Sequence, residues 1–265
     1  MNDATGKSFS NLVDLLAQLR GPQGCPWDQE QTHDSLKRNL LEETYEVLET
    51  IDENDAAKLP EELGDVLLQV LFHAQIASEA SQFTIGNVME SLRNKLVRRH
   101  PHVFGGAQAS TPWDVETQWE EIKYQERSQN QEEAPLMDSV PRGMPALAYS
   151  QTIQQRAARV GFDWDHVTEV LEKMEEECQE LEHAEALEDQ ESELGDLFFT
   201  VVNLSRWLNI DAESTLRKAA TRFALRFTAM EAHCQREGIA LSDLSIEEKD
   251  SLWQEAKRQQ RSSQW

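Results

Sequence analysis

Apolar residues recur every three or four positions over long stretches of the chain, which is the spacing of one face of an amphipathic helix. The first such stretch covers residues 9–19, and further helices are predicted over about 34–52, 60–79, 84–100 and 111–129. In the second half, a long helix is predicted from about residue 212 to a cap at Gly238, and Ser245-x-x-Glu248 is a capping box for the last helix. Loops are predicted at 20–28 and 101–110. Only 11 glycines and 8 prolines occur in 265 residues, so the sequence predicts an all-α protein.

The predicted helix over 60–79 is unusual because a polar strip runs between two apolar faces. Glu62, Asp65, Gln69 and His73 form this strip. These carboxylates need a partner, because an unpaired buried charge costs several kcal/mol or more. Gly64 lies inside the same helix, where glycine is roughly 1 kcal/mol less favourable than alanine, and such a glycine is typical of a close approach by another group.

The second half of the chain repeats the first. A Trp-Asp loop, a Glu-x-x-Glu pair and a Glu-Leu-Gly-Asp stretch follow one another in both halves, and a polar, proline-rich segment separates them. We therefore predict two tandem domains, 1–127 and 145–265, joined by a linker over 128–144. The corresponding blocks are Gly24–Asp28 with Gly161–Asp165, Glu43 and Glu46 with Glu177 and Glu180, Glu62 and Asp65 with Glu193 and Asp196, Lys95 and Arg99 with Arg222 and Arg226, and Trp119 and Lys123 with Trp253 and Lys257.

The charge and the cysteines limit the classes of function. A formal net charge of −24 argues against broad docking on nucleic acid or on an anionic membrane. Cys25, Cys178 and Cys234 form no C-x-x-C pair, so neither a disulfide framework nor a zinc site is predicted, and a reducing cytoplasm is expected. Neither a signal peptide nor a membrane span is expected.

The duplicated acidic blocks favour a metal site. A Glu-x-x-Glu pair on one helix and a Glu-x-x-Asp pair on its neighbour place four carboxylates on facing surfaces, because residues three apart lie on the same side of a helix. Carboxylate oxygens without cysteine or histidine suit Mg²⁺, with Mn²⁺ as a substitute. Because Mg²⁺ usually completes its shell with water and phosphates, nearby cations would favour a polyphosphate ligand. The candidate cations are Lys95, Arg99, Arg222 and Arg226.

Other interpretations of the same residues stay open. A single acidic pair on a helix is usually a solvated face, and only the duplication reverses that preference. The tryptophans Trp27, Trp119, Trp164 and Trp253 fit core or lid packing better than base stacking. Two alternative functions are a non-enzymatic acidic scaffold with degenerate sites, and a di-iron bundle built on Glu30-x-x-His33 and Glu180-x-x-His183. Five further glutamates are expected on solvated faces: Glu42, Glu49, Glu175, Glu182 and Glu185.

The combined acidic pattern, the Gly24–Asp28 loop and the Arg-Arg-His-Pro-His-Val-Phe segment at 98–104 resemble MazG, the family of two-domain nucleoside triphosphate pyrophosphohydrolases. The resemblance spans nearly the whole chain. It implies two tandem all-α domains, each a helical bundle completed by dimerisation. It also implies Mg²⁺-dependent hydrolysis of nucleoside triphosphates to the monophosphate and pyrophosphate, with broad base tolerance.

The resemblance also assigns roles to residues and favours the C-terminal copy as the main active site. The metal ligands it implies are Glu43, Glu46, Glu62 and Asp65 in the first copy and Glu177, Glu180, Glu193 and Asp196, which are also the catalytic set, in the second. The substrate contacts it implies are Arg222, Arg226, Trp253 and Lys257, with Lys95, Arg99, Trp119 and Lys123 at the matching positions of the first copy.

Overall fold

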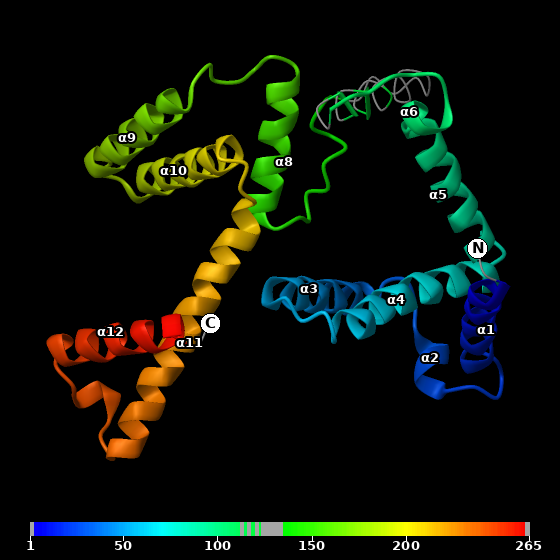
Figure 1. The fold of residues 1–265 in the computed structure, drawn as a ribbon, viewed down its shortest axis with the longest axis horizontal. Helices are drawn as coiled ribbons and strands as arrows, with labels where there is room; N and C mark the ends of the chain where they lie inside the picture. Colours follow the sequence, from blue (N-terminus) through cyan, green and yellow to red (C-terminus); the bar gives the residue numbers. More distant parts are fainter. Residues whose placement is uncertain (1–2, 112–113, 116–117, 120–121, 123–134, 263–265) are drawn as a thin grey trace. The chain divides into compact units, whose positions relative to one another are not determined.

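A computed structural model of the chain describes residues 3–111, 114–115, 118–119, 122 and 135–262. These ranges contain helices and no β-strand, which confirms the predicted all-α class. The chain divides into two compact units, Met1–Glu133 and Ala134–Trp265 (Figure 1). Lys123 and residues 128–134 of the predicted linker lie outside the described residues.

The first unit is built on a hairpin of two helices, α3 and α4, which lie side by side (Figure 1). The amino-terminal helix α1 packs against α4, and its apolar face meets Leu36, Leu71 and Phe72 in a buried core. The helices of this unit are α1 (Asp3–Leu19), α2 (Pro26–Glu30), α3 (Lys37–Glu53), α4 (Leu59–Glu79), α5 (Ile85–Arg99) and α6 (Pro101–Phe104).

Local sequence signals set most of these helix ends. Pro60 lies in the first turn of α4, and Thr84 caps α5 by accepting a hydrogen bond from the Asn87 backbone N–H. The loops predicted at 20–28 and 101–110 are wrong in part, because short helices begin at Pro26 and at Pro101. Proline suits the first helical position, since its fixed φ is that of a helix and the N–H it lacks would be unsatisfied there.

The second unit is built on the corresponding hairpin of α9 (Val167–His183) and α10 (Leu187–Trp207). Helix α8 (Ala146–Arg159) packs against α10, and α12 (Ile246–Ser262) packs against the long α11 (Ala212–Glu237), with a short 3₁₀ helix between them at Leu241–Asp243 (Figure 1). Buried residues include Val170 of α9, Val202 of α10 and Met230 of α11. Each half of the chain therefore contains one antiparallel helix hairpin that carries the acidic blocks.

The two caps predicted in the second half are confirmed. Gly238 has φ of 68° at the C-cap of α11, a left-handed conformation that favours glycine. Ser245 and Glu248 exchange reciprocal hydrogen bonds at the start of α12, from Ser245 N–H to Glu248 Oε2 at 2.8 Å and from Glu248 N–H to Ser245 Oγ at 3.2 Å.

Residues 135–144, the described part of the predicted linker, contact α8. Arg156 Nη1 donates to the Leu136 carbonyl at 2.8 Å and to Ser139 Oγ at 2.7 Å. Val140 is buried. These residues are therefore held by specific contacts within the second unit.

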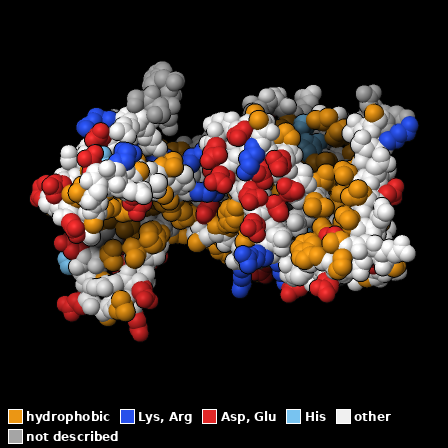
Figure 2. Space-filling view, turned by 90° about the horizontal axis from the view of Figure 1, so that it is seen from below, with side chains coloured by type: hydrophobic (Ala, Val, Ile, Leu, Met, Phe, Trp, Pro, Cys, Tyr) orange, Lys and Arg blue, Asp and Glu red, His pale blue; other side chains and the backbone are white. Residues whose placement is uncertain are grey.

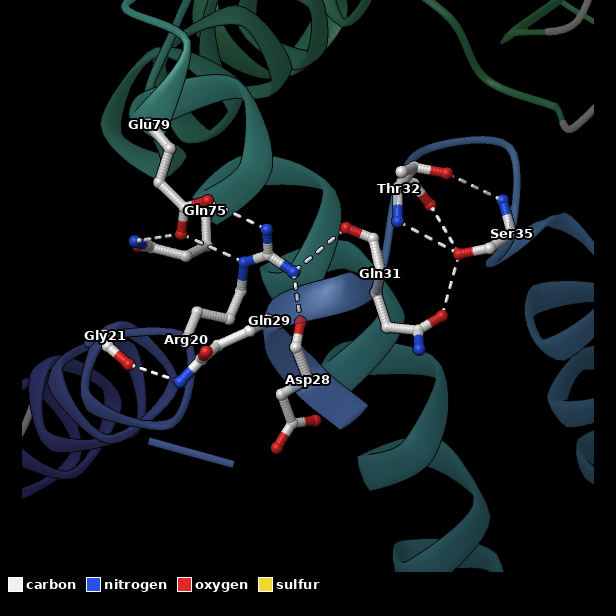
Figure 3. Close-up of polar contacts among 9 residues, drawn as sticks. All are labelled: Arg20, Gly21, Asp28, Gln29, Gln31, Thr32, Ser35, Gln75 and Glu79. Atoms are coloured by element: carbon white, nitrogen blue, oxygen red, sulfur yellow. Dashed lines mark hydrogen bonds and ion pairs between the residues drawn. The ribbon is translucent and has the colours of Figure 1, made fainter. Parts of the chain in front are cut away.

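A buried arginine joins three helices of the first unit at the Gly24–Asp28 loop (Figure 3). The Arg20 side chain is only 6% exposed, and its Nε and Nη2 donate to the two oxygens of Glu79 at 2.9 and 2.8 Å. Its Nη1 donates to the carbonyls of Asp28 and Gln31, the latter at 3.1 Å. The hydrogen bond from Arg20 lowers the pKa of the Glu79 carboxyl. Arg20 thus ties the end of α1 to α2 and to the end of α4.

We expect Arg20→Met to lower the free energy of unfolding by about 2–3 kcal/mol, because it removes charged hydrogen bonds and leaves two backbone carbonyls without their donor. Urea denaturation followed by circular dichroism measures the change. The matched control is Lys37→Met, which removes an exposed pair with Asp34 and should change stability by no more than about 0.5 kcal/mol. Equal stability of the two variants would contradict a structural role for Arg20.

Candidate functional site

Three carboxylates converge between α9 and α10 in the second unit. Glu177 and Glu180 lie on α9 and Glu193 on α10, and one oxygen of each lies within 4.8 Å of the others. Glu177 is only 4% exposed, and Lys173 Nζ contacts its Oε1 at 2.9 Å. Lys173 also contacts Glu176 at 2.8 Å, and the hydrogen bonds to Glu176 and then Glu177 raise the pKa of the lysine.

The first unit contains the corresponding cluster. Glu43 and Glu46 on α3 and Glu62 on α4 bring one oxygen each within 4.8 Å of the others. Glu62 is 4% exposed, and Lys58 Nζ contacts its Oε1 at 2.6 Å. Each buried glutamate therefore has a lysine partner four residues earlier on the chain. Sequence reasoning missed both lysines, although the i, i+4 spacing is a signal that could have found them.

Burial and mutual repulsion raise the pKa of one carboxyl in each cluster. For Glu43 the largest cause is burial, followed by the charges of Asp65 and Glu46. For Glu193 it is again burial, followed by the charges of Glu180 and Asp196. Asp65 and Asp196, the fourth members of the predicted sets, are thus close enough to affect the clusters electrostatically. Groups that repel one another in this way are the groups that a divalent cation would stabilise.

The donor set fits a hard cation. Both clusters consist of carboxylates alone, and the described residues form no further group of three or more possible metal ligands. Oxygen ligands on two facing helices suit Mg²⁺ or Mn²⁺ and do not suit a thiolate-binding or imidazole-binding metal.

The cationic side chains form a second feature that is repeated in both units. The Arg226 guanidinium lies 5.5 Å from the centre of the Trp253 ring, and the Arg99 guanidinium lies 5.5 Å from that of Trp119. Arg226 Nε also donates to Gln260 on α12 at 2.8 Å. The two halves therefore place an arginine over the matching tryptophan in the same way, as the repeat predicts.

Within one unit, these cations do not lie beside the carboxylates. Arg222 and Arg226 belong to α11, and Trp253 and Lys257 belong to α12, which packs on α11 away from the α9–α10 hairpin (Figure 1). Lys95 and Arg99 lie towards the end of α5, which leads away from the α3–α4 hairpin. The structure thus brings three of the predicted carboxylates of each unit together and places the described cations on other helices.

A cavity of about 670 Å³ opens beside the second acidic cluster. It lies between α8, the 161–164 loop, α9 and α10, and Glu177 and Asp196 form part of its wall. Trp164, which also lines it, is 39% exposed and thus not a core residue. Arg206 holds the loop in place, because its guanidinium contacts both oxygens of Asp163, with Nη1 to Oδ2 at 2.9 Å, and donates to Asn203 Oδ1 at 2.8 Å.

The histidines considered for a di-iron site lie elsewhere. His33 Nδ1 is 2.7 Å from His73 Nδ1, and the two rings stack with their centres 5.0 Å apart. His183 Nδ1 is 2.6 Å from the Gln179 carbonyl of its own helix. Neither His33 nor His183 belongs to the two metal-type clusters, so the described residues do not support that alternative.

The glycine that is repeated in each acidic stretch has open space around it. A Cβ at Gly64 or Gly195 would meet no atom within 4 Å in the described part of the chain. The close approach that we predicted at Gly64 is therefore wrong for the contacts within the first unit.

Comparison with known proteins agrees with this geometry. The MazG nucleotide pyrophosphohydrolase domain matches residues 31–104, which include the first acidic cluster. The chain is 48% identical over 252 residues to "Nucleoside triphosphate pyrophosphohydrolase/pyrophosphatase MazG" of Thermotoga maritima, covering 95% of this chain and 96% of that protein. The chain belongs to the MazG family. It is also 42% identical over 258 residues to "Nucleoside triphosphate pyrophosphohydrolase" of Escherichia coli K12, covering 95% of this chain and 98% of that protein.

Membership of the MazG family confirms the resemblance predicted from the acidic pattern. A relative that covers less of the chain, "Nucleoside triphosphate pyrophosphohydrolase" of Mycobacterium tuberculosis, is 37% identical over 228 residues, or 85% of this chain and 59% of that protein.

Among the described residues of this MazG chain, no helix combines the length and apolar character that crossing a membrane requires.

We expect Glu43→Gln to raise the free energy of unfolding at pH 7 in metal-free buffer, because burying a neutral amide costs less than burying a charge and the amide is not repelled by Asp65 and Glu46. The gain should shrink as the pH falls through the raised pKa of Glu43. Well below its ordinary value of 4.5, Glu43 is protonated in both the folded and unfolded states, and the gain should be absent. Urea denaturation of the variant and the wild type from pH 7 to about pH 3 tests this. A gain that is independent of pH would contradict ionisation of Glu43 as its cause.

Proposed function

We propose that this MazG protein hydrolyses nucleoside triphosphates to the monophosphate and pyrophosphate, and that it needs Mg²⁺ to do so. One observation supports this most directly. In each unit, three glutamates on paired helices bring one carboxylate oxygen each within 4.8 Å of the others. Carboxylate oxygens of this kind hold Mg²⁺ that is shared with substrate phosphates. The relatives from Thermotoga maritima and Escherichia coli carry names that state this class of activity.

The chemistry that we propose is attack by water on the α-phosphorus. Glu177, Glu180, Glu193 and Asp196 would hold the ion, which supplies positive charge against the phosphate oxygens. One of these carboxylates would accept a proton from the attacking water as the new bond to phosphorus forms. The bond between the α-phosphorus and the bridging oxygen breaks, and pyrophosphate leaves. Mn²⁺ is expected to substitute for Mg²⁺ because it has the same preference for oxygen ligands.

We assign the main activity to the second unit. The cavity of about 670 Å³ adjoins Glu177 and Asp196 and offers room for the rest of a nucleotide next to the acidic cluster. A formal net charge of −24 argues against broad docking on nucleic acid, and a small anionic ligand would bind only with the help of local cations.

We further propose that the working form is a homodimer. Large apolar side chains are exposed in both units, and Figure 2 shows hydrophobic side chains gathered in broad patches on the face it presents. A second, apolar groove of about 710 Å³ lies along α9, α10 and α11, and is lined by Leu171, Met174, Phe198 and Val201. Contiguous exposed apolar surface of this kind usually marks an interface.

Within one unit, the predicted cations lie apart from the carboxylates, and a second copy of the chain would supply cations to the acidic site. Arg222, Arg226 and Lys257 lie on α11 and α12, away from the acidic hairpin of their own unit. A partner subunit could bring these cations to a bound triphosphate, where they would stabilise the leaving pyrophosphate.

Glu193→Ala should lower the rate of triphosphate hydrolysis by about 10²-fold or more, because it removes a proposed metal ligand. Its helical content should not change. The assay incubates purified protein with each nucleoside triphosphate and Mg²⁺ and separates monophosphate, diphosphate, pyrophosphate and orthophosphate. Glu182→Ala, an exposed position on the same hairpin, is the matched control and should keep wild-type turnover.

Two results would overturn parts of this proposal. If activity survived Glu193→Ala and fell only with Glu62→Ala, the assignment to the second unit would be wrong. Formation of diphosphate and orthophosphate would exclude attack at the α-phosphorus.

Phe198→Asp should convert the dimer to a monomer, because Phe198 is 57% exposed in the chain and lines the apolar groove. Sedimentation velocity should show the wild type at twice the chain mass of 30.4 kDa and the variant at that mass. Leu187→Asp is the control, since Leu187 is also exposed on α10 but does not line the groove. A monomeric wild type would refute the proposed dimer.

A further inference from the structure

The two acidic clusters differ in the charge of one residue at matching positions. Glu62 in the first unit corresponds to Glu193 in the second, and each lies on the second helix of its hairpin. Lys58 lies four residues before Glu62, whereas Asp189 lies four residues before Glu193. Lys58 has helical backbone angles at the start of α4, and Asp189 lies in the first turn of α10. Because side chains four apart lie on the same side of a helix, a cation stands beside the first cluster where an anion stands beside the second.

Lys58 balances part of the negative charge of the first cluster. Its Nζ lies 2.6 Å from Oε1 of the buried Glu62. The hydrogen bond to Glu62 and the charge of that group raise the pKa of Lys58, and the charges of Glu46 and Glu49 contribute as well. The ammonium group therefore acts on two members of the cluster, Glu62 and Glu46. A divalent cation at this cluster would be repelled by Lys58 and would compete with it for Glu62.

Glu193 of the second cluster is instead surrounded by negative charge. Burial raises the pKa of its carboxyl, and so do the charges of four neighbouring carboxylates. These are Glu180, Asp196, Glu177 and Asp189. Asp189 thus adds to the negative potential that attracts a divalent cation to this cluster.

The lysine of the second unit compensates a smaller part of its cluster. Lys173 lies on α9, the first helix of the hairpin, and its Nζ contacts Glu177 at 2.9 Å and Glu176 at 2.8 Å. Glu177 belongs to the cluster of three converging carboxylates, but Glu176 does not. The charge of Lys173 is therefore divided between one member of the cluster and one carboxylate outside it. With Asp189 added, the second cluster keeps more negative charge than the first.

We propose that the residue four positions before the second-helix glutamate sets how tightly each cluster binds a divalent cation. With Lys58 in this position, the first cluster binds the ion weakly, and with Asp189 the second cluster binds it tightly. This inference rests on the proposed function, because it concerns the ion which that function requires. It also gives a physical reason for assigning the main activity to the second unit. Lys58 and Asp189 are positioning residues, since they act on the ion through the charge of the cluster.

Binding of Mn²⁺ to the full chain tests the inference without an enzyme assay. Titration followed by the electron paramagnetic resonance signal of free Mn²⁺ should show a tight and a weak class of site. Their dissociation constants should differ by about 10-fold or more, because a unit charge a few ångströms from a divalent ion has an effect of this order even in water. Low ionic strength keeps the difference measurable, since salt screens charges near the surface. Glu193→Ala should remove the tight class, and Glu62→Ala should remove the weak class.

Asp189→Lys should weaken the tight class by about 10-fold or more and leave the weak class unchanged. Asp189 is exposed, so the variant is expected to fold. Glu188→Lys is the matched control, because it makes the same change of charge in the same first turn of α10. Position 188 faces away from Glu193 around the helix, so this control should keep both wild-type affinities.

Lys58→Asp is the reciprocal variant and should tighten the weak class by a similar factor. Removing the partner of the buried Glu62 could unfold the first unit, and circular dichroism reports whether it does. Asp189→Lys tests the inference in that case, because it changes an exposed residue of the other unit.

Equal dissociation constants for the two clusters in the wild type would overturn the inference and leave the proposed hydrolysis intact. An equal loss of affinity in Asp189→Lys and Glu188→Lys would also overturn it, since the total charge of the chain would then be the cause. The same holds if folded Lys58→Asp bound Mn²⁺ no more tightly than the wild type. If the Mn²⁺ affinities followed the prediction but no nucleoside triphosphate were hydrolysed, the proposed function would fail, whereas the effect of the two residues on metal binding would stand.

Discussion

The constraint on which the rest of the structure depends is that a buried carboxylate needs a compensating partner. Glu62 and Glu177 lie almost wholly inside their units, each with further glutamates within 4.8 Å. A lysine four residues earlier in the chain contacts each of them. One lysine cannot balance three converging carboxylates, and the pKa values of Glu43 and Glu193 are raised first by burial and then by the charges of the neighbouring carboxylates. A site with this excess of negative charge is ready for a divalent cation, and the helix hairpin is the scaffold that maintains it.

The two copies of the hairpin share the acidic clusters but differ in what surrounds them. In the first unit, Trp27 contacts Phe72 edge-to-face, and the rings of His33 and His73 stack. In the second unit, Arg206 donates a hydrogen bond to Asp163 of the 161–164 loop, and a cavity lies between α8 and α10. Both copies thus share the charge arrangement, and in the second copy a cavity of about 670 Å³ adjoins it.

The helices also leave much apolar surface uncovered. Each unit is a hairpin with a few further helices packed against it, and such an arrangement has too few layers to bury all of its long apolar faces. Phe198 on α10 and Leu171 on α9 illustrate this, because both are exposed along one apolar groove. The same open arrangement separates the cations of α11 and α12 from the carboxylates. Association with a second copy would address both features at once, which is why we treat the dimer and the complete site as one proposal.

Much of the fold and of the acidic site could be predicted from the sequence, because both follow from local rules. Helical periodicity, the proline at the start of α4, the caps at Thr84 and Gly238, and the spacing within each Glu-x-x-Glu pair depend on residues within one or two turns. Contacts between distant residues could not be predicted in this way. The Arg20–Glu79 pair joins residues 59 positions apart, and the hydrogen bond from Gln154 to Phe199 joins residues 45 apart. The sequence alone therefore determined the helices and the sets of carboxylates, whereas the tertiary structure decided which side chains face a cavity, because that depends on which helix faces meet and how much water they exclude.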